Sequence, residues 1–79
     1  MLTTLLDDAR RVVADVLGLP AEQIGDDASQ ETLAGWDSLQ HLNIALSIET
    51  RFGVSLSPAE IESMRSLRAI VELLEAKRR

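Results

Sequence analysis

The sequence predicts an all-α fold: a small bundle of three main helices and one short helix, with a long loop between the first two helices. Apolar residues recur at spacings of three and four in separate segments, which is the period of a helix that buries one face. One alternating run, residues 54–56, is too short to build a sheet. A chain of 79 residues has room for one domain, so we expect residues 1–79 to fold as a single unit. Helices packed on helices then cover all the apolar faces.

The first helix is expected over residues 4–17. Thr3 or Thr4 can cap its start, and acidic residues follow in the first turn, where the helix dipole favours them. Gly18 and Pro20 end it, because glycine readily takes the left-handed conformation of a helix end and proline cannot continue a helix. One face carries the apolar residues Leu5, Ala9, Val12, Val13 and Val16.

A long connection, residues 19–36, follows this helix. It is rich in glycine, aspartate and serine, which favour loops. Loops of this length are uncommon in small domains and are often functional. We expect Ile24 and Leu33 to anchor it in the core.

The second helix has the clearest start in the chain. Asp37 is a favoured N-cap, and Gln40 stands three residues later, which is the spacing of a capping box. Gly53 is the expected end. The side chains predicted to face the core are Leu42, Ala45, Ile48 and Phe52. We expect Phe52, the only phenylalanine, to be buried against the first and last helices.

Two further helices complete the predicted bundle. Ser57 and Glu60 repeat the capping-box spacing, and Pro58 stands at the first helical position, where its missing N–H costs nothing. A short third helix should therefore run to about Met64. Ser66 caps the last helix, whose inward side chains are Leu67, Ile70, Val71 and Leu74.

Composition excludes several classes of protein. There is no cysteine, so disulfides and cysteine-based metal sites are excluded. With 13 acidic and 8 basic residues the net charge is −5, which does not suit a nucleic-acid partner. No run approaches the roughly 20 apolar residues of a membrane span. The first eight residues lack the pattern of a signal peptide, so we expect a cytoplasmic protein, without a membrane partner and monomeric by default.

Catalytic interpretations find little support. Ser38 and the only histidine, His41, lie one turn apart, but no Gly-x-Ser-x-Gly turn surrounds the serine and no acid is placed to orient the ring. We therefore expect His41 to be an exposed polar residue. The adjacent acids of residues 7–8 and 26–27 lack the spacing of a calcium loop and are interpreted as solvated surface, so no stable metal site is predicted.

Ser38 is better placed to receive chemistry than to perform it. With Asp37 as the cap, Ser38 would be the first residue of the second helix, with its hydroxyl exposed at the end of the long loop. A phosphate attached there would meet unpaired backbone N–H groups and the positive end of the helix dipole. The alternative is that Asp37 is only a cap and Ser38 a tolerated residue, and the residues taken alone favour this simpler interpretation.

Residues from about Leu5 to Leu74 resemble the acyl carrier protein family, which includes the carrier domains of polyketide and nonribosomal peptide synthases. The family pattern Asp-Ser-Leu at the start of the second helix is matched by residues 37–39. The match continues through residues 44–46, Glu49, residues 52–54 and Leu56. It covers nearly the whole chain, in the expected order of helices.

The resemblance implies an acyl-carrier-like bundle in which Ser38 carries 4′-phosphopantetheine, transferred from coenzyme A by a separate phosphopantetheinyl transferase that uses magnesium. Asp37 would help to hold that magnesium transiently. The thiol of the arm would carry acyl or aminoacyl intermediates as thioesters between a loading enzyme and downstream synthases. The protein would then be a non-catalytic carrier and a substrate of other enzymes.

The second helix departs from the pattern of carriers of general fatty-acid synthesis, which is rich in exposed acids. Here the corresponding places hold Gln40, His41 and Asn43. Together with Leu39 and Leu46, these residues form the expected partner surface. The departure favours a specialised pathway, such as polyketide or nonribosomal peptide synthesis. The alternatives are a carrier of general fatty-acid synthesis and an unmodified helical adaptor that binds partners through the second helix.

Overall fold

The structure is a computed structural model that describes residues 4–77. Its elements are α1 (Leu5–Leu17), a short 3₁₀ turn η1 (Ala21–Gln23), α2 (Ser38–Phe52), α3 (Pro58–Ser63) and α4 (Leu67–Lys77). Within the described residues the only β-type pairing is one isolated bridge. The predicted all-α fold, with three longer helices, one short helix and a long connection after the first, is confirmed.

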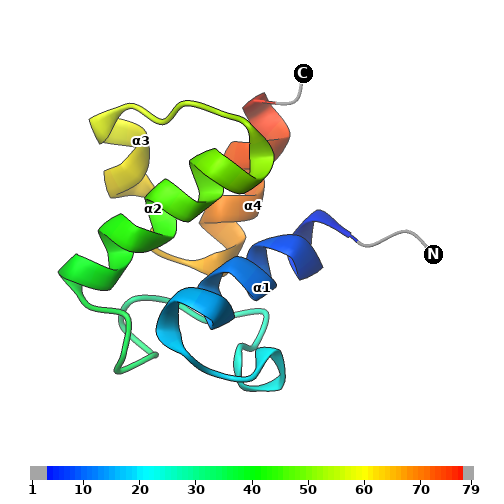
Figure 1. Ribbon diagram of the computed structural model, residues 1–79, viewed down its shortest axis with the longest axis vertical. Helices are drawn as coiled ribbons and strands as arrows, with labels where there is room; N and C mark the ends of the chain where they lie inside the picture. Colours follow the sequence, from blue (N-terminus) through cyan, green and yellow to red (C-terminus); the bar gives the residue numbers. More distant parts are fainter. Residues whose placement is uncertain (1–3, 78–79) are drawn as a thin grey trace.

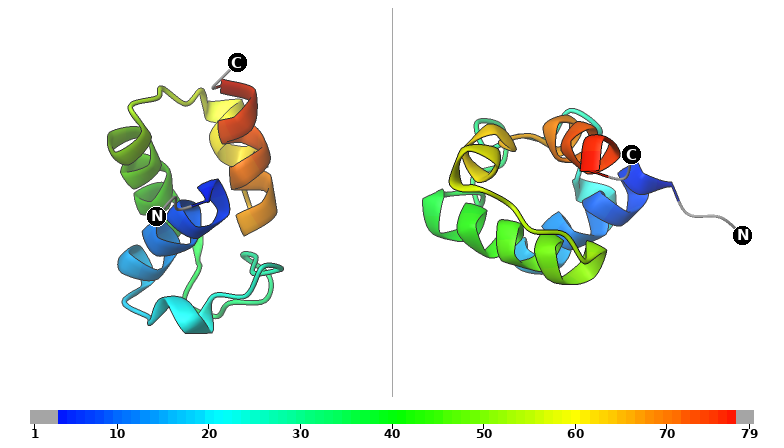
Figure 2. Two further views of the ribbon diagram at one scale, coloured as in Figure 1. Left: turned by 90° about the vertical axis from the view of Figure 1, so that its right-hand side faces the viewer. Right: turned by 90° about the horizontal axis from the view of Figure 1, so that it is seen from above.

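Helix α1 is central to the bundle because it packs against both α2 and α4 (Figure 1). Figure 2 shows α2 and α4 on opposite sides of the molecule, with α1 crossing between them and the long connection closing one end. The buried core lies where these segments meet. It consists of Ala9, Val12, Val13, Ala14, Ile24, Ala28, Trp36, Ile44, Ala45, Ile48, Leu56, Met64, Leu67, Ile70 and Leu74.

The predicted ends of α1 are confirmed. Thr4 is the N-cap, and its hydroxyl accepts a hydrogen bond of 3.0 Å from the backbone N–H of Asp7. Thr3, the other candidate, lies outside the described residues. Gly18 ends the helix with φ of 70°, a left-handed conformation that glycine adopts without steric cost.

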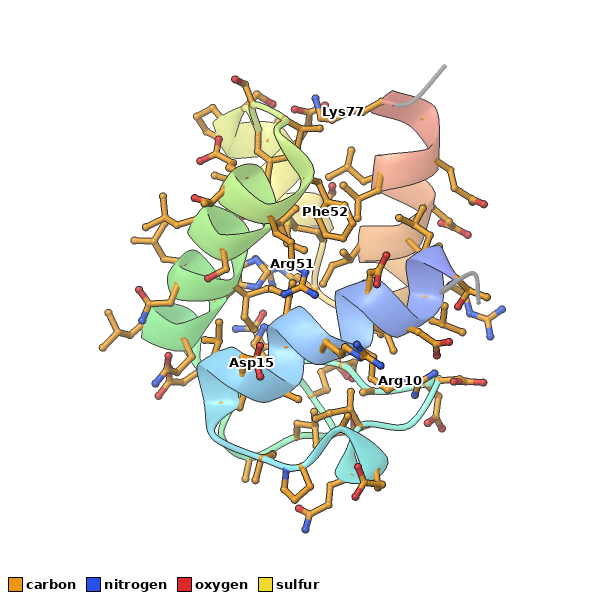
Figure 3. The ribbon with its side chains drawn as sticks, turned by 45° about the vertical axis from the view of Figure 1, so that its right-hand side comes forward. Arg10, Asp15, Arg51, Phe52 and Lys77 are labelled. Carbon is orange, nitrogen blue, oxygen red and sulfur yellow. The ribbon has the colours of Figure 1, made fainter. Side chains whose placement is uncertain are left out.

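The long connection is held at several points rather than left free. Ile24, Ala28 and Trp36 are buried, whereas the predicted anchor Leu33 is only partly buried. The side chain of Arg10 on α1 reaches the connection, where it donates hydrogen bonds to the carbonyl of Ile24 and to the exposed carboxylate of Asp26 (Figure 3). These contacts fix one end of the connection against α1.

A second attachment joins the connection to the segment between α3 and α4. The backbone N–H of Gln30 donates to the carbonyl of Arg65, and that of Leu67 donates to the carbonyl of Ala28, both at 2.9 Å. These two bonds form the isolated bridge. They place the loop that precedes α2 beside the residues that follow α3.

The inward face of α2 differs from the prediction. The buried residues are His41, Ile44, Ala45 and Ile48, so the buried stripe begins one residue earlier than expected. Leu42 is 48% exposed. Phe52 is only partly buried, and its ring lies at the C-terminal end of α2 (Figure 3). It lines one small pocket together with Leu5 and Leu74. The prediction that Leu42 faces the core was therefore wrong. Phe52 lies toward the first and last helices as predicted, but it is only partly buried rather than buried.

The short helix α3 begins with the predicted capping box. The Ser57 hydroxyl accepts from the N–H of Glu60 at 3.1 Å, and the Glu60 carboxylate accepts from the N–H of Ser57 at 2.8 Å. Glu60 also forms an ion pair of 3.0 Å with Lys77 of α4. The hydrogen bond from the Ser57 backbone, followed by the contact with Lys77, holds the pKa of Glu60 below its ordinary value.

Candidate functional site

Ser38 is the first residue of α2 and is exposed, as predicted. Asp37 is the N-cap in an extended conformation, and its carboxylate accepts a hydrogen bond of 2.9 Å from the N–H of Gln40. The Asp37 carbonyl accepts from the N–H of His41 at 2.8 Å. Within residues 4–77, the N–H groups of Ser38 and Leu39 have no acceptor, so two free donors stand beside the serine hydroxyl.

The capping box predicted at α2 is only half formed. Asp37 makes its half, but the side chain of Gln40 does not return to the backbone of the cap. Its carbonyl oxygen instead accepts from the amide of Asn43 at 3.1 Å. The Asp37 cap therefore holds the start of α2 without the reciprocal hydrogen bond that forms at α3.

His41 is buried, at 8% exposure, so the prediction of an exposed residue was wrong. The indole N–H of Trp36 donates to its Nδ1 at 2.9 Å, and its Nε2 lies 2.7 Å from the carbonyl oxygen of Ile61. Because an indole N–H can only donate and a carbonyl can only accept, Nδ1 must be the acceptor and Nε2 must carry the hydrogen. This pattern of bonds corresponds to the Nε2–H tautomer.

This bonding explains why a histidine can lie inside an aliphatic core. Both ring nitrogens are satisfied, so the cost of burying polar atoms is offset. The sequence contained the signal, because His41 lies three, four and seven residues before Ile44, Ala45 and Ile48, all of them buried. Both nitrogens are also occupied, so His41 has no free nitrogen with which to activate Ser38 as a catalytic base.

Trp36 supplies the other side of this arrangement and is 1% exposed. Its ring stacks near that of His41, with ring centres 6.1 Å apart and planes inclined by 24°. It immediately precedes the Asp37 cap, so burying the indole ties the end of the long connection to the interior. We infer that this fixes the position from which Ser38 projects.

A groove of about 450 Å³ lies beside Ser38, between the first turns of α2 and the short helix α3. His41 and Leu42 line one side, and Ile61 and Arg65 line the other. Gln30, from the long connection, also contributes to it. The attachment of this connection to the segment after α3 thus brings residues from three parts of the chain to one place.

The family model "phosphopantetheine attachment site" matches residues 7–74, which include the cap, the serine and the groove. The chain belongs to this family. It is 42% identical over 77 residues, 95% of its own length and 88% of the relative's, to the polyketide-8 synthase acyl carrier protein 2 of Streptomyces avermitilis. Two proteins named acyl carrier protein are more distant. The protein of Saccharopolyspora erythraea is 28% identical, over 87% of this chain and 73% of the relative. The protein of Petrotoga mobilis is 26% identical, over 92% of this chain and 86% of the relative.

These likenesses confirm that the chain is an acyl carrier protein and that its cofactor is phosphopantetheine. Acyl carrier proteins are non-catalytic; they act together with synthases and with a phosphopantetheinyl transferase. The start of α2 fits a phosphodiester, because an exposed hydroxyl and two free N–H groups meet at the positive end of a helix. The described part of the chain has no cluster of three or more side chains able to hold a metal ion. No helix in it is long and apolar enough to cross a membrane.

The outer face of α2 carries three exposed leucines next to this site. Leu39 is 68% exposed, Leu42 is 48% and Leu46 is 52%. Their spacings of three and four place them on one side of the helix, with the exposed Asn43 between them. Of the predicted partner surface, Leu39, Asn43 and Leu46 lie on this face, Gln40 is partly buried and His41 faces the interior. Leu42, which the sequence had assigned to the core, belongs to the exposed set.

Proposed function

We propose that Ser38 is the residue to which 4′-phosphopantetheine is attached. We further propose that the thiol of the arm carries acyl intermediates as thioesters between enzymes of a polyketide or related specialised pathway. The observation that carries the proposal is the exposed hydroxyl of Ser38 at the first position of α2, directly after the Asp37 cap and inside the matched region. The similarity to a protein named as a polyketide synthase carrier supports the type of pathway.

Asp37 has two roles in this proposal. Its carboxylate caps α2, and during transfer of the arm it contributes one ligand to a magnesium ion whose remaining ligands come from coenzyme A and the transferase. The carboxylate is exposed and, within residues 4–77, accepts one hydrogen bond, from the N–H of Gln40. A transient ion is consistent with a site that offers a single carboxylate.

The surface proposed to contact partners is the outer face of α2, beside the arm. It combines Leu39, Leu42 and Leu46 with the neutral polar groups of Gln40 and Asn43. Exposed leucines on one face suit a partner with an apolar patch, and burying them together contributes more than scattered contacts would. The carried acyl group is proposed to be chosen by the loading enzyme that docks here.

The attachment is tested by incubating the apo-protein with coenzyme A, magnesium and a phosphopantetheinyl transferase of broad specificity, followed by intact mass measurement. We expect a gain of one phosphopantetheinyl group, which peptide mapping places on Ser38. Ser38→Ala is the matched control. It should remain unmodified and melt near the parent, because the Asp37 cap is retained. Modification of the Ser38→Ala protein would contradict the assignment of the residue. A parent that gains no mass would favour the unmodified adaptor.

A further inference from the structure

His41 links three parts of the structure at the edge of the groove beside Ser38. Its ring receives the indole N–H of Trp36 on one side and donates to the carbonyl of Ile61 on the other. Trp36 belongs to the end of the long connection, and Ile61 to α3. The bond to Ile61, at 2.7 Å, is therefore a direct link from α2 to α3 between two residues that line the groove.

Helix α3 itself has few other restraints, although Leu56 before it and Met64 after it are buried. It consists of six residues, none of which is fully buried. The ion pair of Glu60 with Lys77 joins it to α4, not to α2. A short helix without buried side chains is the part of such a bundle that opens at least cost. The hydrogen bond from His41 thus restrains the element that would have to move if the groove were to deepen.

The groove beside Ser38 is open to solvent, so a long alkyl chain on the arm could be fully enclosed only if α3 moved away from α2. This separation would break the bond of His41 to Ile61 and leave a donor and an acceptor unpaired in the interior, which is unfavourable. Without that movement, a chain lying in the groove would stay in contact with solvent.

We propose that His41 is a positioning residue that determines cargo specificity: by holding α3 against α2 it keeps alkyl chains out of the interior, so that the carrier presents its cargo exposed. This inference rests on the proposed attachment of the arm to Ser38. It assigns to His41 a role that concerns the fate of the carried group rather than the attachment chemistry. The cargo class that it favours is short or polar acyl groups, which gain little from burial in an apolar interior.

The test compares acetyl and octanoyl groups loaded on the arm from their coenzyme A derivatives. Each sample is first checked by intact mass, and the thioester is then cleaved with hydroxylamine while its loss is followed. In the parent both thioesters should react at similar rates, because neither chain is buried. In His41→Leu, which cannot bond to Ile61, the octanoyl thioester should react about three- to tenfold more slowly than the acetyl thioester, the range that loss of one hydrogen bond produces.

Two control variants separate this role from a general effect on stability. His41→Gln offers an N–H and a carbonyl in place of the two ring nitrogens, so it should move the rate ratio back toward that of the parent. Ile70→Val removes one methyl group from a fully buried side chain of α4 that does not line the groove, and it should lower the melting temperature without changing the ratio. If Ile70→Val changes the ratio as His41→Leu does, the effect is one of stability and the proposal is wrong.

The parent alone also tests the inference, even if His41→Leu does not fold. Proton NMR of the octanoyl-loaded parent should show the indole signal of Trp36 and the Nε2–H signal of His41 at the positions seen with the acetyl group, since there is one of each residue. Movement of both signals on octanoyl loading, or slow cleavage of the octanoyl thioester in the parent, would overturn the proposal. Failure of the attachment itself would appear earlier, as absence of the loaded mass, and is thereby distinguished.

Discussion

Asp37 has one structural and one proposed chemical role, and two substitutions separate them. Asparagine at this position retains the oxygen that accepts from Gln40 and caps helices about as well as aspartate, but it removes the negative charge. Alanine removes both the cap and the charge. Asp37→Asn should therefore leave stability almost unchanged and slow transfer of the arm, whereas Asp37→Ala should affect both properties.

The expected loss of stability follows from the geometry of the cap. The hydrogen bond between Asp37 and the N–H of Gln40 is 2.9 Å long and exposed, and Gln40 does not complete the reciprocal bond of a capping box. Loss of an N-cap costs about 0.5–2 kcal/mol, and an exposed single bond belongs near the middle of that range, at about 1 kcal/mol. For a domain of about 60–100 residues this corresponds to a fall in Tm of about 4–8 °C.

The assay combines thermal unfolding by circular dichroism with the initial rate of transfer at several magnesium concentrations. If the carboxylate binds magnesium during transfer, Asp37→Asn should need more magnesium to reach half of its maximal rate, and its Tm should match that of the parent. Transfer by Asp37→Asn at the parent's rate and magnesium dependence would remove the carboxylate from the mechanism. A Tm of Asp37→Ala equal to the parent's would show that the cap contributes nothing measurable.

Three further predictions concern the core, the short helix and the docking surface. Truncation of the half-buried Phe52 to Ala should lower the free energy of unfolding by about 2 kcal/mol, less than the ~3–5 kcal/mol expected for a fully buried phenylalanine. Chemical denaturation should therefore still show a cooperative transition, and a molten variant would contradict this. The pKa of Glu60 is lower in the folded state than in the unfolded state. Its contribution to stability is therefore fully present above the pKa of the unfolded state and is lost as the pH falls through the pKa of the folded state. The free energy of unfolding of Glu60→Gln should therefore fall less steeply than the parent's as the pH drops below about 4.5. An unchanged dependence on pH in this range would show that Glu60 does not contribute in this way. Since Gln40 and Asn43 are neutral, partner binding to α2 should vary little between low and high salt, and should become salt-sensitive when both are replaced by Glu.

The fold could be predicted from the sequence because its start and stop signals are local. The caps Thr4, Asp37 and Ser57 and the terminal glycines Gly18 and Gly53 all occupy the predicted positions. Each depends only on residues within one turn, so no knowledge of the rest of the chain is needed. The long connection was predicted as a loop for the same reason.

The orientation of α2 could not be predicted so well, because it depends on partners distant in sequence. A histidine is expected at the surface unless both nitrogens find partners, and one partner of His41 lies 20 residues away in α3. His41, rather than Leu42, occupies the inner face of the first turns, and Leu42 lies at the edge of the groove, whereas Ala45 and Ile48 are buried as predicted. Phe52, at the end of the same helix, lies at the margin of the core.

The first turns of α2 place opposite requirements on neighbouring residues. Asp37 must cap the helix, Ser38 must stay accessible, Leu39 and Leu42 face outward, and His41 must close the interior behind them. In the proposed attachment to Ser38, the negative phosphodiester would lie near the capping carboxylate, and the helix dipole and two free N–H groups would oppose the repulsion. Additional acids on the outer face would increase that repulsion. The neutral leucine-rich face would therefore let the proposed partner dock by apolar contact beside the arm without adding charge to this region.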